Sequence, residues 1–259
     1  MTPEFQRHFD ACHTFVPPSG RLALHISGQL AGWLTAGIVD DLRGFSSVSV
    51  LDETVNLLDP QALPGIAFAL SSRGRFRHRG ELFDVRAVPD GPVLSTIDRG
   101  ALPAFGIQAV GMHLNGLVRR ADGLHLWVAR RAANKALDPG KLDHLAAGGV
   151  SAGMDAWETL IKESAEEASI PEALASRAVK RAEVSYAMMR PEGLRRDILH
   201  CYDLDLPEDF TPVAADGEVE SFELWPVERA YEAVRDSDAF KFNVNLVLID
   251  LFQRLGMAV

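Results

Sequence analysis

Residues 148–170, with the sequence GGVSAGMDAWETLIKESAEEASI, decide the fold, because a glycine-rich turn runs directly into an amphipathic helix. Asp155 is placed to cap this helix, and Glu158 three residues later completes a capping box. Side chains at the i, i+3, i+4 and i+7 spacing predict one buried stripe along the helix. The members of the stripe are Trp157, Leu160, Ile161, Ser164 and Ala168.

Three glutamates, Glu163, Glu166 and Glu167, gather on the other side of the same helix. Carboxylates at this spacing repel one another by about a few tenths of a kcal/mol per pair on an exposed helix. Hard oxygen ligands collected in this way suit Mg²⁺ or Mn²⁺. The alternative for such a pattern is a solvated acidic face without a ligand.

The whole stretch resembles the Nudix box, the signature of hydrolases that act on nucleoside and other diphosphates. The family pattern is Gly, five residues, Glu, seven residues, then Arg-Glu-apolar-any-Glu-Glu-any-Gly-apolar. Gly148 fills the first position, and Lys162, Glu163, Ser164, Glu166, Glu167 and Ile170 stand in register with the later ones. Three residues depart from the pattern: Met154 replaces Glu, Lys162 replaces Arg and Ser169 replaces Gly. The resemblance predicts an α/β/α sandwich with a mixed sheet.

The resemblance also implies roles for the box residues. Glu166 and Glu167 are expected to bind the metal directly, and Glu163 to act as general base or to orient the attacking water. A backbone carbonyl of the Gly148–Gly149 turn, with Gly148 named first, is expected to complete the coordination of Mg²⁺, with Mn²⁺ as a substitute. Lys162 is expected to tether Glu163, or else to pair with Glu158 or Glu166 on an exposed face.

The loss of Glu at Met154 affects a peripheral or second-metal position in the family pattern. It is expected to lower the metal stoichiometry without removing hydrolysis.

Candidate substrate ligands flank the box. Arg131 and Lys135 precede it and could hold a diphosphate as a cationic pair, with solvated loop charges as the alternative. Glu218 and Glu220 follow it, where Nudix enzymes often take a further carboxylate. Three further cations, Arg190, Arg195 and Arg196, are expected to be surface charges of a loop, with contact to a phosphate as the alternative.

Composition limits the partners. The chain has 259 residues, a net charge of −10 and a pI near 5.3, so a nucleic-acid partner is not expected. Cys12 and Cys201 form neither a disulfide framework nor a zinc site. The start of the chain lacks an apolar signal core, and no run approaches the roughly 20 apolar residues that span a bilayer. A cytoplasmic protein without a membrane partner is expected, and a homodimer is left open.

The order of patterns predicts two domains: a small α+β accessory domain at residues 1–104 and the Nudix domain at residues 105–259. Helices are expected at residues 3–15, 38–45, 64–70, 172–182, 227–235 and 243–255. Strands are expected at residues 22–34 with a turn near Gly28, and at 48–58, 82–88, 93–97, 112–119, 124–130, 184–189, 197–205 and 219–225.

Several phrases are similar to the Nudix proteins related to thiamine pyrophosphokinase. They are WVARRAANKALDPGKLDHLAAGG at residues 127–149, HLNG at 113–116, DGEVE at 216–220 and FKFN at 240–243. This resemblance implies the two-domain arrangement and hydrolysis of thiamine diphosphate or a damaged analogue to a monophosphate and phosphate.

Other substrates and other functions stay open. Nucleoside diphosphate sugars or dinucleotides are the second choice of substrate. An isoprenoid-diphosphate isomerase has a similar Arg-x-x-x-Lys phrase but needs a catalytic Cys and Glu, which the remote Cys12 and Cys201 do not obviously supply. A non-catalytic ligand-binding module is supported by Met154 and Lys162 and opposed by the three glutamates.

Overall fold

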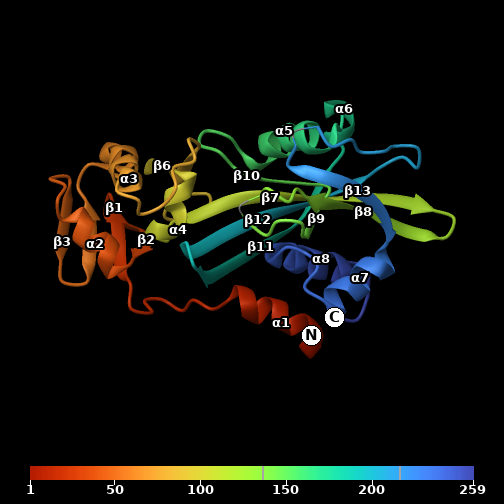
Figure 1. The fold of residues 1–259 in the computed structure, drawn as a ribbon, viewed down its shortest axis with the longest axis horizontal. Helices are drawn as coiled ribbons and strands as arrows, with labels where there is room; N and C mark the ends of the chain where they lie inside the picture. The colour runs from red at the N-terminus through yellow and green to blue at the C-terminus, as the bar shows by residue number, and fades with distance from the viewer. Residues whose placement is uncertain (136, 216) are drawn as a thin grey trace.

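The computed structural model describes residues 1–135, 137–215 and 217–259. Asp216, the first residue of the DGEVE phrase, and Ala136, in the loop before the glycine-rich turn, lie outside the described residues. A central mixed sheet lies between two helical layers (Figure 1). Helices α5 (Ala156–Ala168) and α6 (Glu172–Ala175) cover one face, and α7 (Val227–Asp236) and α8 (Phe242–Arg254) cover the other. The predicted α/β/α sandwich is confirmed.

The central sheet has seven strands in the order β11-β12-β7-β8-β13, with β10 paired to β7 and β9 paired to β8. β12 runs parallel to β7 and the other pairs are antiparallel. The strands are β7 (Gln108–Arg120), β8 (Gly123–Arg131), β9 (Leu142–Asp143), β10 (Ala146–Gly149), β11 (Val179–Arg190), β12 (Gly193–Asp205) and β13 (Val219–Pro226).

One edge of the long strand β7 pairs with two different strands. It pairs with β10 over residues 111–114 and with β8 over residues 116–120. β10 therefore leaves the plane shared by β8 and β13, and its second edge is not paired with any described strand. This edge faces α5, which packs on β10.

The register of β10 decides which of its backbone groups reach that free edge. The Ala147 N–H donates to a Glu167 oxygen, and the Val150 N–H donates to Val110 on the β7 side. Opposed residues of an antiparallel pair either exchange both hydrogen bonds or neither, so Gly148 bonds toward β7 and Ala147 toward the free edge. The carbonyl of Ala147 therefore points the same way as its N–H.

Helix α5 begins with the predicted capping box. Asp155 Oδ1 accepts from the N–H groups of Trp157 and Glu158, each at 2.8 Å, and Glu158 Oε2 accepts from the Asp155 N–H at 2.9 Å. The helix ends at Ser169, which has a left-handed φ of 54° where the family pattern has glycine. The Ser169 hydroxyl donates to the Val213 carbonyl at 3.0 Å and fixes this end.

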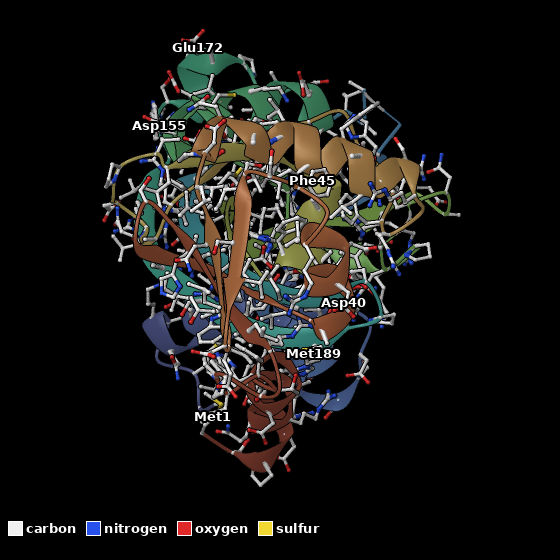
Figure 2. All side chains as sticks on the ribbon, turned by 90° about the vertical axis from the view of Figure 1, so that its left-hand side faces the viewer. Met1, Asp40, Phe45, Asp155, Glu172 and Met189 are labelled. Carbon is white, nitrogen blue, oxygen red and sulfur yellow. The ribbon has the colours of Figure 1, made fainter. Side chains whose placement is uncertain are left out.

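The predicted buried stripe of α5 is only partly right. Leu160, Ser164 and Ala168 are buried, but Trp157 is 38% exposed although its ring centre lies 6.1 Å from that of Tyr202 on β12. Glu167 is buried although it was predicted on the polar side. Figure 2 shows Asp155, at the start of α5, on the opposite side of the molecule from Met1.

The N-terminal part forms its own core around a four-stranded sheet in the order β2-β1-β4-β3. Its elements are β1 (Leu22–Ile26), β2 (Gln29–Leu34), α2 (Ala36–Leu42), β3 (Val48–Leu51), β4 (Thr54–Leu57), η1 (Pro60–Ala62), α3 (Leu63–Ser72), β5 (Leu82–Val85), β6 (Ser95–Asp98), η2 (Arg99–Ala101) and α4 (Leu102–Phe105). Helix α1 (Pro3–Cys12) lies apart from this core, beside α7 and α8 (Figure 1).

The β5–β6 hairpin joins the N-terminal part to the glycine-rich turn. The Ala152 N–H donates to the Leu82 carbonyl at 2.7 Å, and the Ser151 hydroxyl donates to Glu81 Oε1 at 2.7 Å. A Cβ atom built on Gly149 would lie 2.6 Å from Cζ of Phe83. The turn is therefore held from outside the sandwich as well as from within it.

Three expected elements differ from the structure. Residues 172–182 form only the short helix α6, because the chain enters β11 at Val179 and alternates along it. Residues 48–58 form the hairpin β3–β4, with the turn residue Asp52 at a left-handed φ of 49°. Arg195 and Arg196 lie within β12 and not in a loop. Among the described residues, no helix combines the length and apolarity needed to cross a membrane.

We propose the domain boundary at residue 104 and expect residues 105–259 to fold, but with lower stability than the full chain. The fragment lacks α1, whose Phe5 and Cys12 are each 1% exposed. Loss of a buried Phe side chain alone removes about 1.5–3 kcal/mol of burial. Thermal unfolding followed by circular dichroism checks this, with Phe5→Ala in the full chain as reference and Phe68→Ala, at an exposed position, as control. An insoluble, protease-sensitive fragment would refute the boundary.

Candidate metal and substrate site

Glu163 reaches the site because residue 148 has no side chain. A Cβ atom at Gly148 would lie 2.5 Å from Glu163 Cγ and 2.8 Å from its Oε1, closer than real contacts allow. Glycine at this position therefore lets the Glu163 side chain lie directly on β10. Burial raises the pKa of Glu163, although Lys162 opposes that shift.

Glu167 is the most enclosed of the three glutamates, with 8% of the residue exposed. Its Oε2 accepts from the Ala147 N–H at 2.8 Å on the free edge of β10. Burial raises the pKa of Glu167 to about 8, and the charges of Asp143, Glu163 and Glu218 push in the same direction. A carboxylate crowded by others in this way is stabilised by an added cation.

Lys162 contacts both neighbouring glutamates. Its Nζ lies 3.1 Å from Glu163 Oε1 and 2.7 Å from Glu166 Oε2. Of the three expected partners of Lys162, Glu163 and Glu166 are in contact with it, and the hydrogen bonds to Glu166 and Glu163 raise the pKa of Lys162. The ammonium partly neutralises a cluster that would otherwise be strongly anionic.

The carbonyl that faces the glutamates belongs to Ala147. The expectation named Gly148, but the Gly148 oxygen points toward β7, where it lies 3.1 Å from a Cβ built on Gly111. The register places the Ala147 carbonyl on the free edge, beside Glu167. Gly148 contributes by leaving room for Glu163.

The two carboxylates downstream of the box, Glu218 and Glu220, lie in different surroundings. The charge of Glu218 acts on both Glu163 and Glu167, so this residue lies near the cluster. Glu218 is also in contact with Lys135. Glu220 is exposed and falls at an irregularity in the pairing of β13 with β8, between Val219 and Ser221. Glu218 is therefore the better placed of the two.

Arg131 and Lys135, which were expected to hold a diphosphate together, bind different protein groups in this structure. Arg131 donates to Asp143 Oδ2 at 2.6 Å and to the carbonyls of Leu137 and Asp138. It therefore shapes the loop before β9, while Lys135 contacts Glu218. Both cations already have protein partners in this structure.

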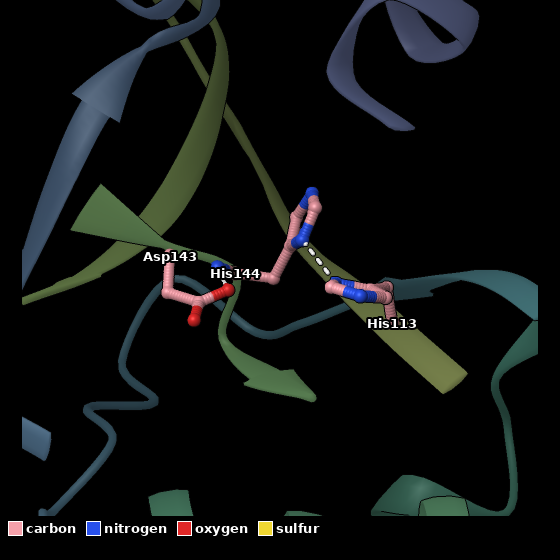
Figure 3. A group of neighbouring side chains, drawn as sticks. All are labelled: His113, Asp143 and His144. Carbon is pink, nitrogen blue, oxygen red and sulfur yellow. Dashed lines mark hydrogen bonds between the residues drawn. The ribbon is translucent and has the colours of Figure 1, made fainter. Parts of the chain in front are cut away.

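His113 on β7, Asp143 at the end of β9 and His144 just after it form a buried group (Figure 3). Their potential ligand atoms lie within 4.8 Å of one another, and the two Nδ1 atoms are 2.8 Å apart in a hydrogen bond. Burial would raise the pKa of Asp143, but Lys241, His113 and Arg131 hold it well below its usual range. Burial lowers the pKa of His144 to about 4 and that of His113 as well.

This buried group is a poor place for a divalent ion. Asp143 supplies one negative charge, and it already pairs with Arg131 and with Lys241, whose Nζ is 3.5 Å away. A metal ion would add two positive charges to this arrangement. Glu163, Glu167, Glu218 and the Ala147 carbonyl suit a hard cation better, because they supply oxygen donors with excess negative charge. Glu166 is half exposed and bonded to Lys162, and among the described residues no three of these carboxylates bring ligand oxygens within 4.8 Å of one another.

A cavity of about 110 Å³ opens beside the Gly148–Gly149 backbone, on the side of Phe83. Phe83 and Arg99 come from the N-terminal part, so the wall of this cavity is shared between the two parts of the chain. Its other charged lining residues are Arg195, Arg196, Asp197 and Lys241. A second cavity of about 320 Å³ is lined by Met154, which replaces the family Glu, together with apolar residues such as Val88 and Val110 and charged residues such as Arg86 and Glu183.

Sequence reasoning missed the residues that only the sheet brings together. His113 and His144 are 31 positions apart and show no ligand spacing. Arg195 and Arg196 were expected on the surface, yet they line the cavity. The sequence signal for these residues is that His113 and Lys241 belong to HLNG and FKFN, two phrases similar to the resembled group.

Known proteins share sequence similarity with this chain over most of its length. The NUDIX domain family matches residues 114–244, so the chain belongs to the Nudix family and is a Nudix-type diphosphate hydrolase. "Nudix hydrolase 24, chloroplastic" of Arabidopsis thaliana is 35% identical over 266 residues, covering 98% of this chain and 73% of that protein. "Nudix hydrolase 20, chloroplastic" of the same plant is 44% identical over 228 residues, covering 88% and 58%.

A crystal structure from Deinococcus radiodurans is 21% identical, covers 66% of this chain and 98% of its own, and has a TM-score of 0.48.

Proposed function

We propose that this protein hydrolyses a small organic diphosphate to a monophosphate and phosphate, with Mg²⁺ as the metal and Mn²⁺ as a substitute. The observation that carries the proposal is the enclosed carboxylate Glu167, hydrogen-bonded to the free edge of β10 and crowded by Glu163 and Glu218. Such a group needs a cation to be fully ionised at neutral pH.

The residues that would hold the metal are Glu163, Glu166, Glu167 and the Ala147 carbonyl, with Glu218 nearby. When bound, a divalent ion offsets the charge of the diphosphate and lowers the pKa of a water ligand. Glu163 is the proposed general base, because burial raises its pKa toward the range in which a carboxylate takes up a proton. Lys162 holds the Glu163 side chain in place through the 3.1 Å contact.

Substrate binding is assigned to Arg131, Lys135, Lys162, Glu218 and Glu220 by the sequence. The structure supports Lys135 and Glu218 as groups at the edge of the carboxylate cluster, and Arg131 as the residue that orders the loop before β9. The favoured substrate is thiamine diphosphate or a damaged analogue, which rests on the sequence resemblance. Nucleoside diphosphate sugars and dinucleotides are the second choice, in a cytoplasmic setting.

The test is a competition among thiamine diphosphate, oxythiamine diphosphate, ADP-ribose and NADH at equal concentration with Mg²⁺, scored by kcat/KM for each. Preference for one of the two thiamine compounds is expected. Preference for ADP-ribose or NADH would remove the thiamine assignment and leave diphosphate hydrolysis in place. Omission of the metal, with chelator present, is the control and should abolish turnover of every compound.

A non-catalytic ligand-binding module is the second candidate, favoured by Met154 and Lys162. It predicts tight binding of one of these compounds and no release of phosphate with Mg²⁺ or Mn²⁺.

A further inference from the structure

The buried residue His113 has one ring nitrogen that is bonded and one that is open. Its Nδ1 lies 2.8 Å from Nδ1 of His144 in a hydrogen bond (Figure 3). Its Nε2 bonds to none of the described residues and keeps accessible surface, so it opens onto the cavity that His113 lines beside Gly148 and Gly149. The residue is 3% exposed. A polar group so enclosed, with an unused position toward a cavity, indicates a ligand atom there.

The surroundings of His144 decide which of the two rings donates in this bond. His144 Nε2 is enclosed and has no hydrogen-bond partner among the described residues. If His144 accepted at Nδ1, its own proton would lie on Nε2 as an enclosed N–H without an acceptor, which is the costly and rare case. Burial lowers the pKa of His113 and of His144, so both rings are neutral at pH 7. His144 therefore donates from Nδ1, and the single proton of His113 lies on Nε2, toward the cavity.

Asn243 on helix α8 adds a second polar group to the same cavity. It lines the cavity and is 5% exposed. Its Oδ1 has no hydrogen-bond partner among the described residues. An amide presents either its oxygen or its N–H group when it turns about the last side-chain bond. Asn243 can therefore match a donor or an acceptor of a ligand, whereas His113 is fixed as a donor.

The remaining walls of the cavity favour an uncharged group. Three cations of the lining are each paired with a carboxylate: Arg99 with Glu81, Arg195 with Asp197 and Lys241 with Asp143. Arg196 alternates with Arg195 along β12 and so points to the other face of the sheet. Apolar side chains complete the walls, among them Phe83, Leu102, Ile107, Leu194 and Leu199. Apolar walls with a few fixed polar groups are typical of a site for an organic ring.

The cavity continues from the carboxylate cluster. Ala147, whose N–H donates to Glu167 at the free edge of β10, also lines the cavity. His113 stands opposite Ala147 on β7. A substrate whose diphosphate lies at that edge can thus place its organic part beside His113.

We propose that His113 is a specificity-determining residue, whose Nε2–H donates to an acceptor atom in the organic part of the substrate. The acceptor is a ring nitrogen or a carbonyl oxygen of an uncharged heterocycle. His144 is the positioning residue that fixes the proton of His113 on Nε2, and the Asn243 amide binds a second atom of the same ring. This assignment names the chemistry of the organic part and therefore rests on the proposed function.

Nitrogen-15 NMR of the metal-free, full-length protein with labelled histidine tests the fixed proton. Long-range proton–nitrogen spectra distinguish a ring nitrogen that carries a proton from one that does not. We expect the proton of His113 on Nε2 and that of His144 on Nδ1. In His144→Phe, the His113 proton should distribute over both nitrogens while circular dichroism shows the native fold. A wild-type His113 that carries its proton on Nδ1 overturns the proposal.

Calorimetric binding of thiamine monophosphate and of AMP, without metal, tests the contact and separates two sources of such a ring. His113→Phe keeps a flat ring but loses the donor, so binding of the preferred compound should weaken about three- to tenfold, the range of one neutral hydrogen bond. His113→Gln keeps an N–H donor and should lose less. His8→Phe is the matched control, because His8 is 5% exposed and bonds to the Val234 carbonyl at 2.8 Å, outside the cavity. It should bind both compounds as the wild type does.

The proposal is overturned if the wild type binds neither compound, or if His113→Phe binds the preferred one as tightly as the wild type. If that variant unfolds, the wild-type spectra decide: the His113 Nε2 signal must shift when the compound is added, and an unmoved signal overturns the proposal. In turnover with Mg²⁺, His113→Phe should raise KM and keep kcat within about twofold, because His113 touches the organic part and not the reacting phosphate. Binding that depends on His113 without hydrolysis would contradict the proposed function and leave this site standing.

Discussion

Glu167→Gln is expected to lower kcat at least about 10³-fold while the protein stays folded. The amide keeps an oxygen that can accept from the Ala147 N–H, so the link between α5 and β10 survives. It cannot carry the negative charge that a hard divalent cation requires of its ligand. Phosphate release with Mg²⁺ measures the loss of turnover, and calorimetric titration with Mn²⁺ measures the loss of affinity. Wild-type turnover by this variant would remove Glu167 from the site.

The same variant should change how stability depends on pH in metal-free protein. The pKa of Glu167 is raised from 4.5 to about 8, so between these values the folded state holds a proton that the unfolded state has lost. The free energy of unfolding then falls as pH rises through this window, by up to about 1.4 kcal/mol per pH unit. Glutamine has no such proton, so its profile should be flatter and its stability at pH 8 higher.

Glu166→Gln is the matched control for this pH effect, because the Glu166 side chain is 51% exposed. It should leave the pH profile of stability close to that of the wild type. Urea unfolding at pH 5, 6, 7 and 8 with a chelator present makes the comparison. An identical slope for wild type and Glu167→Gln would show that the Glu167 carboxyl is ionised in the folded protein without metal.

Gly148→Ala is expected to lower kcat about 100-fold with little loss of stability. The new methyl group would overlap Glu163 Cγ and Oε1, which belong to a flexible side chain. Glu163 can swing away, so the fold is kept and the proposed general base is displaced. In this variant, kcat with Mg²⁺ should therefore fall while the melting temperature stays close to that of the wild type.

The adjacent variant Gly149→Ala should behave in the opposite way. Its methyl group would lie 2.6 Å from the ring of Phe83, which is 3% exposed and packed in the N-terminal core. An enclosed ring cannot move aside, so overpacking should cost about 1–3 kcal/mol of stability. Equal effects of the two variants on melting temperature would contradict the different roles assigned to the two glycines.

The box and its helix could be predicted because their determinants are local. The capping box of α5 depends on residues three apart, and the acidic pattern follows from helical spacing alone. The helix predicted at residues 172–182 failed because β11 pairs with β12 from Val179 onward, and this long-range pairing overrides local preference.

Part of the candidate site depends on contacts that spacing does not encode. Ala147 faces Glu167 and Gly148 bonds toward β7 because residues of β10 alternate between its two edges in the register that pairs it with β7. This register is not given by the sequence alone. Arg195 reaches the cavity because its face of β12 packs on α8, where its guanidinium lies 5.9 Å from the centre of the Phe242 ring. Phe83 reaches Gly149 from a hairpin more than sixty positions earlier in the chain. The glutamates on helix α5 could be predicted from the sequence, whereas the residues that other strands bring next to them could not.

Residues of β10 alternate between its two edges, and this alternation limits where relatives of this protein can gain or lose residues. One residue added or lost between Leu142 and Ala147 would exchange the two edges and the two faces of β10. The residue beneath Glu163 would then no longer be Gly148, and the donor to Glu167 would turn toward β7. Insertions and deletions should therefore be tolerated in the loop between β8 and β9 and selected against between β9 and β10, whatever substrate each relative has come to use.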